Sequence, residues 1–152
     1  MVELVATRAS IVGCFAEPEA LDALERTDGA HACRVAPDEV MLVGEAGAAE
    51  ELVRLVAENV TASDADAAVL DTTDGWSIWS LVGDGARDAF AKLSELELCP
   101  EGFAQGDVAH VPTRVIAEAE RLHLLVPAMW GAYMRERILA LGVREIADGG
   151  TW

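Results

Sequence analysis

Three copies of one pattern, a strand, a small or cyclic breaker residue and then a helix, follow one another along this 152-residue sequence. The breakers are Gly44, Gly83 and Pro127. Apolar residues recur at helical spacing after the second and third breakers, at Ala86, Ala89, Phe90 and Leu93 and again at Trp130, Met134, Ile138 and Leu141. This repeated order favours layered α+β architecture over a doubly wound nucleotide-binding fold.

Two strands are predicted before each helix. The first pair is too closely spaced for a helical crossover, so it forms an antiparallel hairpin about Ala36-Pro37. The Asp74-Gly75 turn joins the second pair, and Pro112 marks an edge or a bulge in the third. The expected elements are strands 31–35 and 38–43 with helix 48–59, a strand ending near Asp71 and a strand 76–82 with a helix from 86, and strands 107–117 and 121–126 with a helix from 128.

These elements predict mainly antiparallel sheets with helices packed on one face, in two fused ferredoxin-like halves. With 52% hydrophobic residues, the chain can bury about two thirds of its unfolded surface. We therefore expect a single compact domain over 1–152, with pseudo-repeat halves 1–66 and 67–152. The last residues, 147–152, are expected to be irregular.

Charge and hydropathy limit the partners. A net charge of −16 provides no basic patch for phosphate backbones, so nucleic acid is not expected to bind. No uncharged apolar run approaches the roughly 18 residues of a membrane span. The first ten residues contain Glu3 and Arg8 and lack the longer apolar core of a secretory signal peptide. We expect a cytoplasmic protein that does not bind membranes.

The acidic residues are unevenly distributed. Residues 1–106 hold six Arg or Lys against 21 Asp or Glu, whereas residues 107–152 hold five against six. One interpretation is a solvated acidic face together with a buried C-terminal helix. The other is a nearly neutral C-terminal surface that docks on a partner.

Several predicted strands are apolar on both faces. In 76–82, for example, Trp76 and Ile78 point to one face while Trp79 and Leu81 point to the other. Helices can cover only one face, so the other must meet a second sheet or another polypeptide. The candidate interface residues are Trp79, Leu81, Trp130, Tyr133 and Trp152.

No motif predicts a catalytic, cofactor-binding or metal-binding residue. Asp71 and Asp74 are explained by turn chemistry, and Asp84 by capping of the following helix. Ser80 lacks a nucleophile motif, and His123 on a strand is interpreted as a packed histidine. The three cysteines, Cys14, Cys33 and Cys99, lie far apart without a Cys-x-x-Cys pair and are expected to be reduced, mostly buried thiols.

Four segments together resemble the gamma subunit of heterotetrameric sarcosine oxidase, a family similar in fold to the folate-binding region of the glycine-cleavage T protein. They are 35–43, 69–76, 81–86 and 103–107. The resemblance implies an aminomethyltransferase-like fold and a non-catalytic accessory subunit that packs against larger flavin- and folate-dependent oxidase subunits.

The same resemblance leaves alternatives open. Folate binding is implied by the family alone, and segment 106–112 matches poorly the T-protein pattern in which an acidic residue holds the pterin. A stand-alone binder of folate or another one-carbon carrier, or an aminomethyltransferase-like enzyme, is therefore the second hypothesis. Self-association through the same apolar surface is the third.

Overall fold

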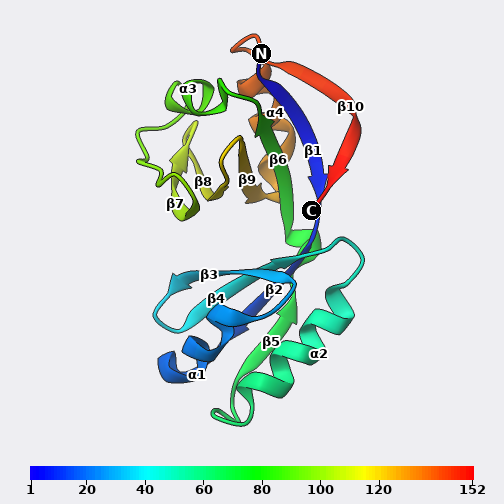
Figure 1. Cartoon of the computed structure of the whole chain (residues 1–152), viewed down its shortest axis with the longest axis vertical. Coiled ribbons are helices and arrows are strands. Elements are labelled where there is room, and N and C mark those ends of the chain that lie inside the picture. Colours follow the sequence, from blue (N-terminus) through cyan, green and yellow to red (C-terminus); the bar gives the residue numbers. More distant parts are fainter. The chain divides into compact units, whose positions relative to one another are not determined.

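A computed structural model describes the backbone of residues 1–152 and every side chain except those of Glu25, Arg26 and Asp148. The chain divides into two compact units (Figure 1). The N-terminal unit consists of residues 8–73 and 151–152, and the C-terminal unit of residues 1–7 and 74–150. Each has antiparallel strand pairs with helices on one face of its sheet, which confirms the predicted fold class. The single domain with halves 1–66 and 67–152 stays a prediction.

The sheet of the N-terminal unit has the strand order β3-β4-β2-β5. Its elements are β2 (Ser10–Phe15), α1 (Pro18–Asp22), η1 (Ala23–Arg26), β3 (Ala30–Ala36), β4 (Glu39–Gly44), α2 (Ala49–Val60) and β5 (Ala68–Asp71). The β3–β4 hairpin and α2 confirm the first predicted unit. The register pairs Val12 with Leu42, so both side chains lie on one face. On this face α2 packs its buried stripe, Leu52, Val56 and Val60.

The sheet of the C-terminal unit has the order β10-β1-β6-β9-β8-β7. Its elements are β1 (Glu3–Arg8), η2 (Thr73–Gly75), β6 (Trp76–Val82), α3 (Ala86–Ala91), β7 (Gly102–Val108), β8 (Val111–Ala117), β9 (Arg121–Pro127), η3 (Ala128–Trp130), α4 (Gly131–Leu139) and β10 (Arg144–Thr151). Leu81 pairs with Leu122, and both belong to the core that Phe90 of α3 and Met134 of α4 complete. The third predicted unit is thus confirmed as β8, β9 and α4.

The strands also bury apolar side chains on the face away from the helices. In the C-terminal unit, Ile78 of β6 pairs with Leu125 of β9, and both are buried. In the N-terminal unit, Met41 and Val43 of β4 are buried on the corresponding face. Strands in both units therefore bury apolar side chains on both faces of their sheets, as the sequence predicts.

The second predicted hairpin is wrong, because β5 and β6 belong to different sheets. The local turn chemistry is nevertheless as predicted: Asp71 Oδ1 accepts hydrogen bonds from the hydroxyl and the backbone N–H of Thr73 at 2.6 and 3.0 Å. These bonds hold the pKa of the Asp71 carboxyl below its ordinary value. A turn motif fixes the bend of the chain and does not decide which strand the next segment pairs with.

Two predictions about the ends of elements are also wrong. The strand expected over 107–117 is two strands, since β7 ends at Val108 and β8 begins at Val111. Asp84 does not cap α3: Gly85 occupies that position, and the exposed Asp84 carboxylate lies 3.5 Å from the N-terminal amine.

The C-terminal segment is strand β10 and not the irregular tail that the sequence indicates. It lies beside β1, and Arg144 N–H donates to Val2 O at 3.3 Å. A Cβ atom at Gly149 would lie 2.9 Å from Ala6 O, so glycine allows this close approach of two backbones. Backbone pairing of this kind leaves no apolar alternation for sequence reading to detect.

The three thiols differ in accessibility. Cys14 and Cys33 are buried, Cys99 is exposed, and none of them forms a disulfide. Burial, together with the nearby Asp64 carboxylate, raises the pKa of the Cys14 thiol to about 11.

We therefore expect iodoacetamide to label Cys99 alone in the native protein and all three cysteines in denaturant, as measured by mass spectrometry. The variant Cys99→Ser should lose the fast labelling. Rapid modification of Cys14 in the native protein would contradict its burial in β2.

Candidate functional site

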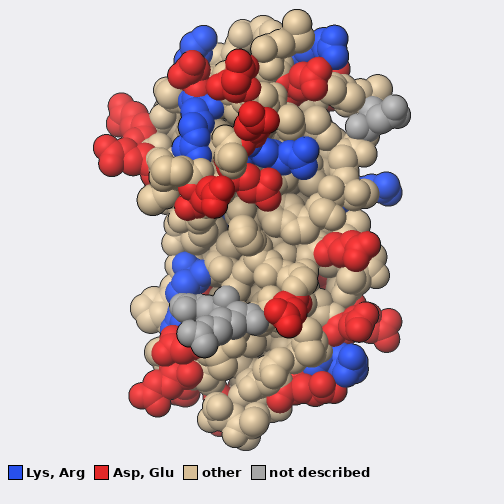
Figure 2. Space-filling model, viewed as in Figure 1, with Lys and Arg blue, Asp and Glu red and all other residues tan. Residues whose placement is uncertain are grey.

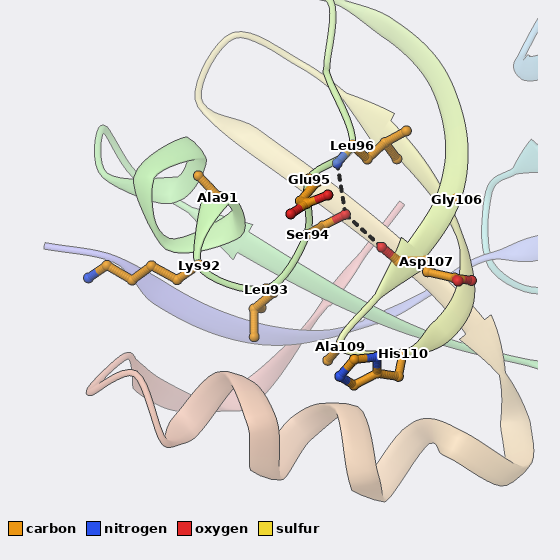
Figure 3. A pocket seen from close by; sticks show the side chains of 10 residues that line it. All are labelled: Ala91, Lys92, Leu93, Ser94, Glu95, Leu96, Gly106, Asp107, Ala109 and His110. Carbon is orange, nitrogen blue, oxygen red and sulfur yellow. Dashed lines mark hydrogen bonds between the residues drawn. The ribbon is translucent and has the colours of Figure 1, made fainter.

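An open hollow of about 660 Å³ lies in the C-terminal unit, between the segment after α3 and the β7–β8 hairpin (Figure 3). Residues 91–96 line one wall, and Gly106, Asp107, Ala109 and His110 line the other. Sequence reading missed this site, because its two walls are brought together by hydrogen bonds between distant segments.

Hydrogen bonds to the backbone hold the two walls together. The Ser94 hydroxyl donates to Asp107 O at 2.6 Å and accepts the Leu96 N–H at 3.1 Å, as Figure 3 shows. The Ala109 N–H donates to Leu93 O at 2.7 Å. The Ser94 side chain therefore links the two walls of the hollow through its hydrogen bond to Asp107 O.

The tip of the hairpin carries two consecutive non-glycine residues with positive φ, 48° at Ala109 and 68° at His110. A two-residue hairpin turn of this kind prefers Asn-Gly, because a Cβ atom in the left-handed region costs about 1–2 kcal/mol. The Tyr133 hydroxyl of α4 holds the turn by donating to Ala109 O at 2.9 Å. Backbone strain concentrates at functional sites, so this turn marks the hollow as the candidate site.

Relieving the strain should stabilise the protein. We expect His110→Gly to raise the free energy of unfolding by about 0.5–1 kcal/mol, because glycine adopts positive φ without steric cost while losing more entropy on folding. Urea denaturation measures this difference. His110→Ala is the matched control: it removes the same imidazole but keeps a Cβ atom, and equal stability of the two variants would contradict a strained turn.

The ionisable groups around the hollow do not converge on one point. Figure 3 shows the Lys92 and Asp107 side chains extending in opposite directions from the hollow. Among the residues whose side chains are described, no group of His, Cys, Asp and Glu could hold a metal ion. General acid–base catalysis needs a base within hydrogen-bond reach of its substrate, and Lys92 and Asp107 do not face each other across the hollow.

A buried polar chain crosses the same sheet. Thr7 Oγ1 lies 2.6 Å from Ser80 Oγ, which lies 2.7 Å from His123 Nδ1. His123 Nε2 lies 3.7 Å from Glu118 Oε1. The order Ser–His–Glu resembles a nucleophilic triad, but Ser80 and His123 are buried, so Ser80 is not accessible to a substrate. His123 is the packed histidine that the sequence predicts. The hydrogen bonds that join Thr7, Ser80 and His123 satisfy polar groups that would otherwise be buried without partners.

The candidate interface residues have different surroundings. Leu81 is 0% exposed within the core of the C-terminal unit, so its side chain offers no area to a docking partner. Trp79 packs against the same core, and its indole N–H donates to Gly131 O at 2.8 Å. Trp152 belongs to the N-terminal unit, where its ring lies 6.0 Å from that of His31.

Met129 and Trp130 are exposed apolar residues, and Tyr133 beside them is partly buried against the core of the C-terminal unit. Met129 is 82% exposed and Trp130 44% exposed. The Trp130 and Tyr133 rings meet edge to face with centroids 5.8 Å apart. We call Met129, Trp130 and Tyr133 the η3–α4 surface. Sequence reading found two of its three members and missed Met129, whose exposure the helical pattern does not reveal.

Comparison with known proteins identifies the fold. No family model matches the chain, and no curated protein matches it. A chain of the heterotetrameric sarcosine oxidase from Corynebacterium sp. U-96, in complex with pyrrole 2-carboxylate, has a TM-score of 0.73 at 17% identity and is matched over 96% of this chain and 88% of that chain.

Two further solved structures share the arrangement. The glycine cleavage system aminomethyltransferase T from Bartonella henselae has a TM-score of 0.71 at 14% identity, over 95% of this chain and 47% of that chain. The regulatory subunit of aspartate kinase from Thermus thermophilus has a TM-score of 0.52 at 14% identity, over 91% and 94%. The TM-scores show a shared fold, the one that the sequence resemblance implies. At identities of 14–17%, the likeness shows the fold alone. Membership of the gamma-subunit family stays a prediction.

Proposed function

We propose that the chain is a non-catalytic accessory subunit that packs against larger subunits of a flavin- and folate-dependent oxidase. The observation that carries this proposal is the extent of the match to the sarcosine oxidase chain, 96% of this chain and 88% of that one. Nearly the whole of one polypeptide in a heterotetrameric oxidase therefore has this fold. A fold alone does not fix a function, so the surfaces of this chain have to support it as well.

The η3–α4 surface supports a protein partner. Trp and Tyr are enriched at interface hot spots, and exposed Met and Trp side chains gain free energy when a partner removes them from water. This surface lies in residues 107–152, which are nearly neutral. Elsewhere acidic side chains predominate, and Figure 2 shows them spread over one face of the molecule. A neutral apolar surface on an acidic chain is the natural place for a partner to dock.

Isolation of the tagged chain from the organism that encodes it tests the proposal. We expect larger subunits in fixed stoichiometry and flavin absorbance in the same fraction. A monomer at low micromolar concentration, with no partner recovered, would count against an accessory role. Light scattering of the isolated chain separates this role from self-association, since a stable homodimer would be detected without any partner.

The match to aminomethyltransferase T favours a second candidate function, the binding of folate or another one-carbon carrier. This chain spans about half of that protein's length, 47%. Titration with tetrahydrofolate while the melting temperature is followed tests this function directly. Binding raises the melting temperature once the ligand exceeds its dissociation constant. An unchanged melting temperature at tetrahydrofolate concentrations far above the expected dissociation constant would exclude folate binding. It would leave the accessory role unaffected.

A further inference from the structure

The outer edge of β5 provides backbone groups for another strand. β5 ends the sheet order β3-β4-β2-β5, so it pairs on one side only. On that side Thr72 N–H donates to Ile11 O at 2.9 Å. Bonded and non-bonded pairs alternate in an antiparallel ladder, so Leu70 also directs its backbone groups to β2, whereas Val69 and Asp71 direct theirs outward. In the described part of the chain, nothing bonds to these outward N–H and C=O groups.

Apolar side chains lie next to this edge. Leu70 is 53% exposed, and on the neighbouring strand Phe15 is 41% exposed. Both lie on the helix-free face, because Leu70 pairs with Gly13 and Phe15 is two residues further along β2. A Cβ atom at Gly13 would lie 3.5 Å from Phe15 Cε2, so the Phe15 ring lies over this glycine, which is the residue opposite Leu70. A strand added beside β5 would therefore place every second side chain near an apolar surface that is already formed.

The charge around the edge is negative. Asp64 and Asp66 precede β5 and Asp71 ends it, while residues 55–73 contain no Lys or Arg. The nearest arginine in the sequence before this stretch, Arg54, donates to Glu58 at 2.9 Å on α2. A basic segment would thus find complementary charge here, whereas a second copy of a chain with net charge −16 would be repelled.

We propose that the outer edge of β5 binds an extended segment of a partner protein in which apolar residues alternate with Lys or Arg. The segment adds a fifth strand to this sheet: its backbone bonds to Val69 and Asp71, its apolar side chains contact Leu70 and Phe15, and its basic side chains face the aspartates. This edge belongs to the N-terminal unit and shares no residue with the η3–α4 surface of the C-terminal unit, so the proposal does not depend on the accessory role.

Titration of the full chain with a short, end-blocked synthetic peptide of alternating Lys and Val tests the proposal. In NMR spectra we expect the amides of Val69 and Asp71 to shift and their hydrogen exchange to slow as peptide is added. Leu70→Lys, a change at an exposed side chain, should weaken binding at least about tenfold. The charge-matched control Ala140→Lys, at an exposed position of the other unit, should bind like the unmodified protein.

Two control peptides separate the contributions. A peptide of alternating Glu and Val should not bind, because the aspartates repel it. A Lys–Val peptide with N-methylated backbone amides should also fail, since it cannot form the ladder.

Four results would overturn the proposal. The first is that the amide signals of Val69 and Asp71 do not change up to about 1 mM peptide, and the second is that either control peptide binds as tightly as the Lys–Val peptide. The third is that Leu70→Lys binds the Lys–Val peptide with unchanged affinity. The fourth is that hydrogen exchange at the β5 edge slows as the protein concentration increases, without any peptide. The last would assign the edge to a second copy of the chain.

Discussion

Replacing Leu81 with alanine is expected to lower the free energy of unfolding by about 2–5 kcal/mol. Leu81 is 0% exposed and is paired with Leu4 on one side and Leu122 on the other. Removal of its side chain leaves a cavity between the sheet and the helices that the surrounding core cannot fully close. Urea denaturation would show this as a lower midpoint with an unchanged slope, because the surface exposed on unfolding stays the same.

Met129→Ala is the matched control for this experiment. Met129 is 82% exposed in the same unit, so its truncation should change the free energy of unfolding by less than about 0.5 kcal/mol. If Leu81→Ala were as stable as this control and instead weakened partner binding, Leu81 would belong to the interface that its sequence position first suggested.

The second large effect is expected at the η3–α4 surface. Met129→Glu combined with Trp130→Ala should weaken binding to the partner subunits at least about 30-fold, because hot-spot residues contribute about 2 kcal/mol or more and a buried unpaired charge adds a further cost. Calorimetry with the isolated partner subunits measures the change. Loss of the edge-to-face contact with Tyr133 should cost only about 0.5–1.5 kcal/mol of stability, so the variant still folds.

Ala62→Glu is the control for the added charge. Ala62 is exposed after α2 in the N-terminal unit, so the substitution adds the same charge to a residue that is not part of the η3–α4 surface. It should leave partner affinity unchanged. Equal losses in the two variants would indicate that net charge, and not this surface, governs the association.

Local patterns in the sequence predicted the elements that local chemistry determines. The β3–β4 hairpin follows from two short apolar runs about Ala36-Pro37, and α2 and α4 follow from helical spacing of apolar residues. The strands β1 and β10 and the separation of β5 from β6 were not predictable in this way. Which strand pairs with which depends on backbone contacts between segments distant in the sequence, as between Gly149 and Ala6.

The same reasoning explains what the sequence revealed of the site. Alternation showed that β6 is apolar on both faces, but it could not show that Leu81, and not Ile78, faces the helices. The β7–β8 turn has no Asn-Gly signal in the sequence. Ala109 and His110 adopt positive φ there, and hydrogen bonds that join Ala109 to Leu93 and Tyr133 fix the turn. A turn that tertiary contacts impose leaves no sequence motif.

Hydrogen exchange on the chain, isolated alone and within the assembly recovered from its own organism, tests the central claim most directly. If the chain is an accessory subunit docked through the η3–α4 surface, the amides of residues 128–135 exchange more slowly in the assembly than in the free chain. Identical exchange of these amides in both samples, or recovery of the chain with no larger subunit, would contradict that claim.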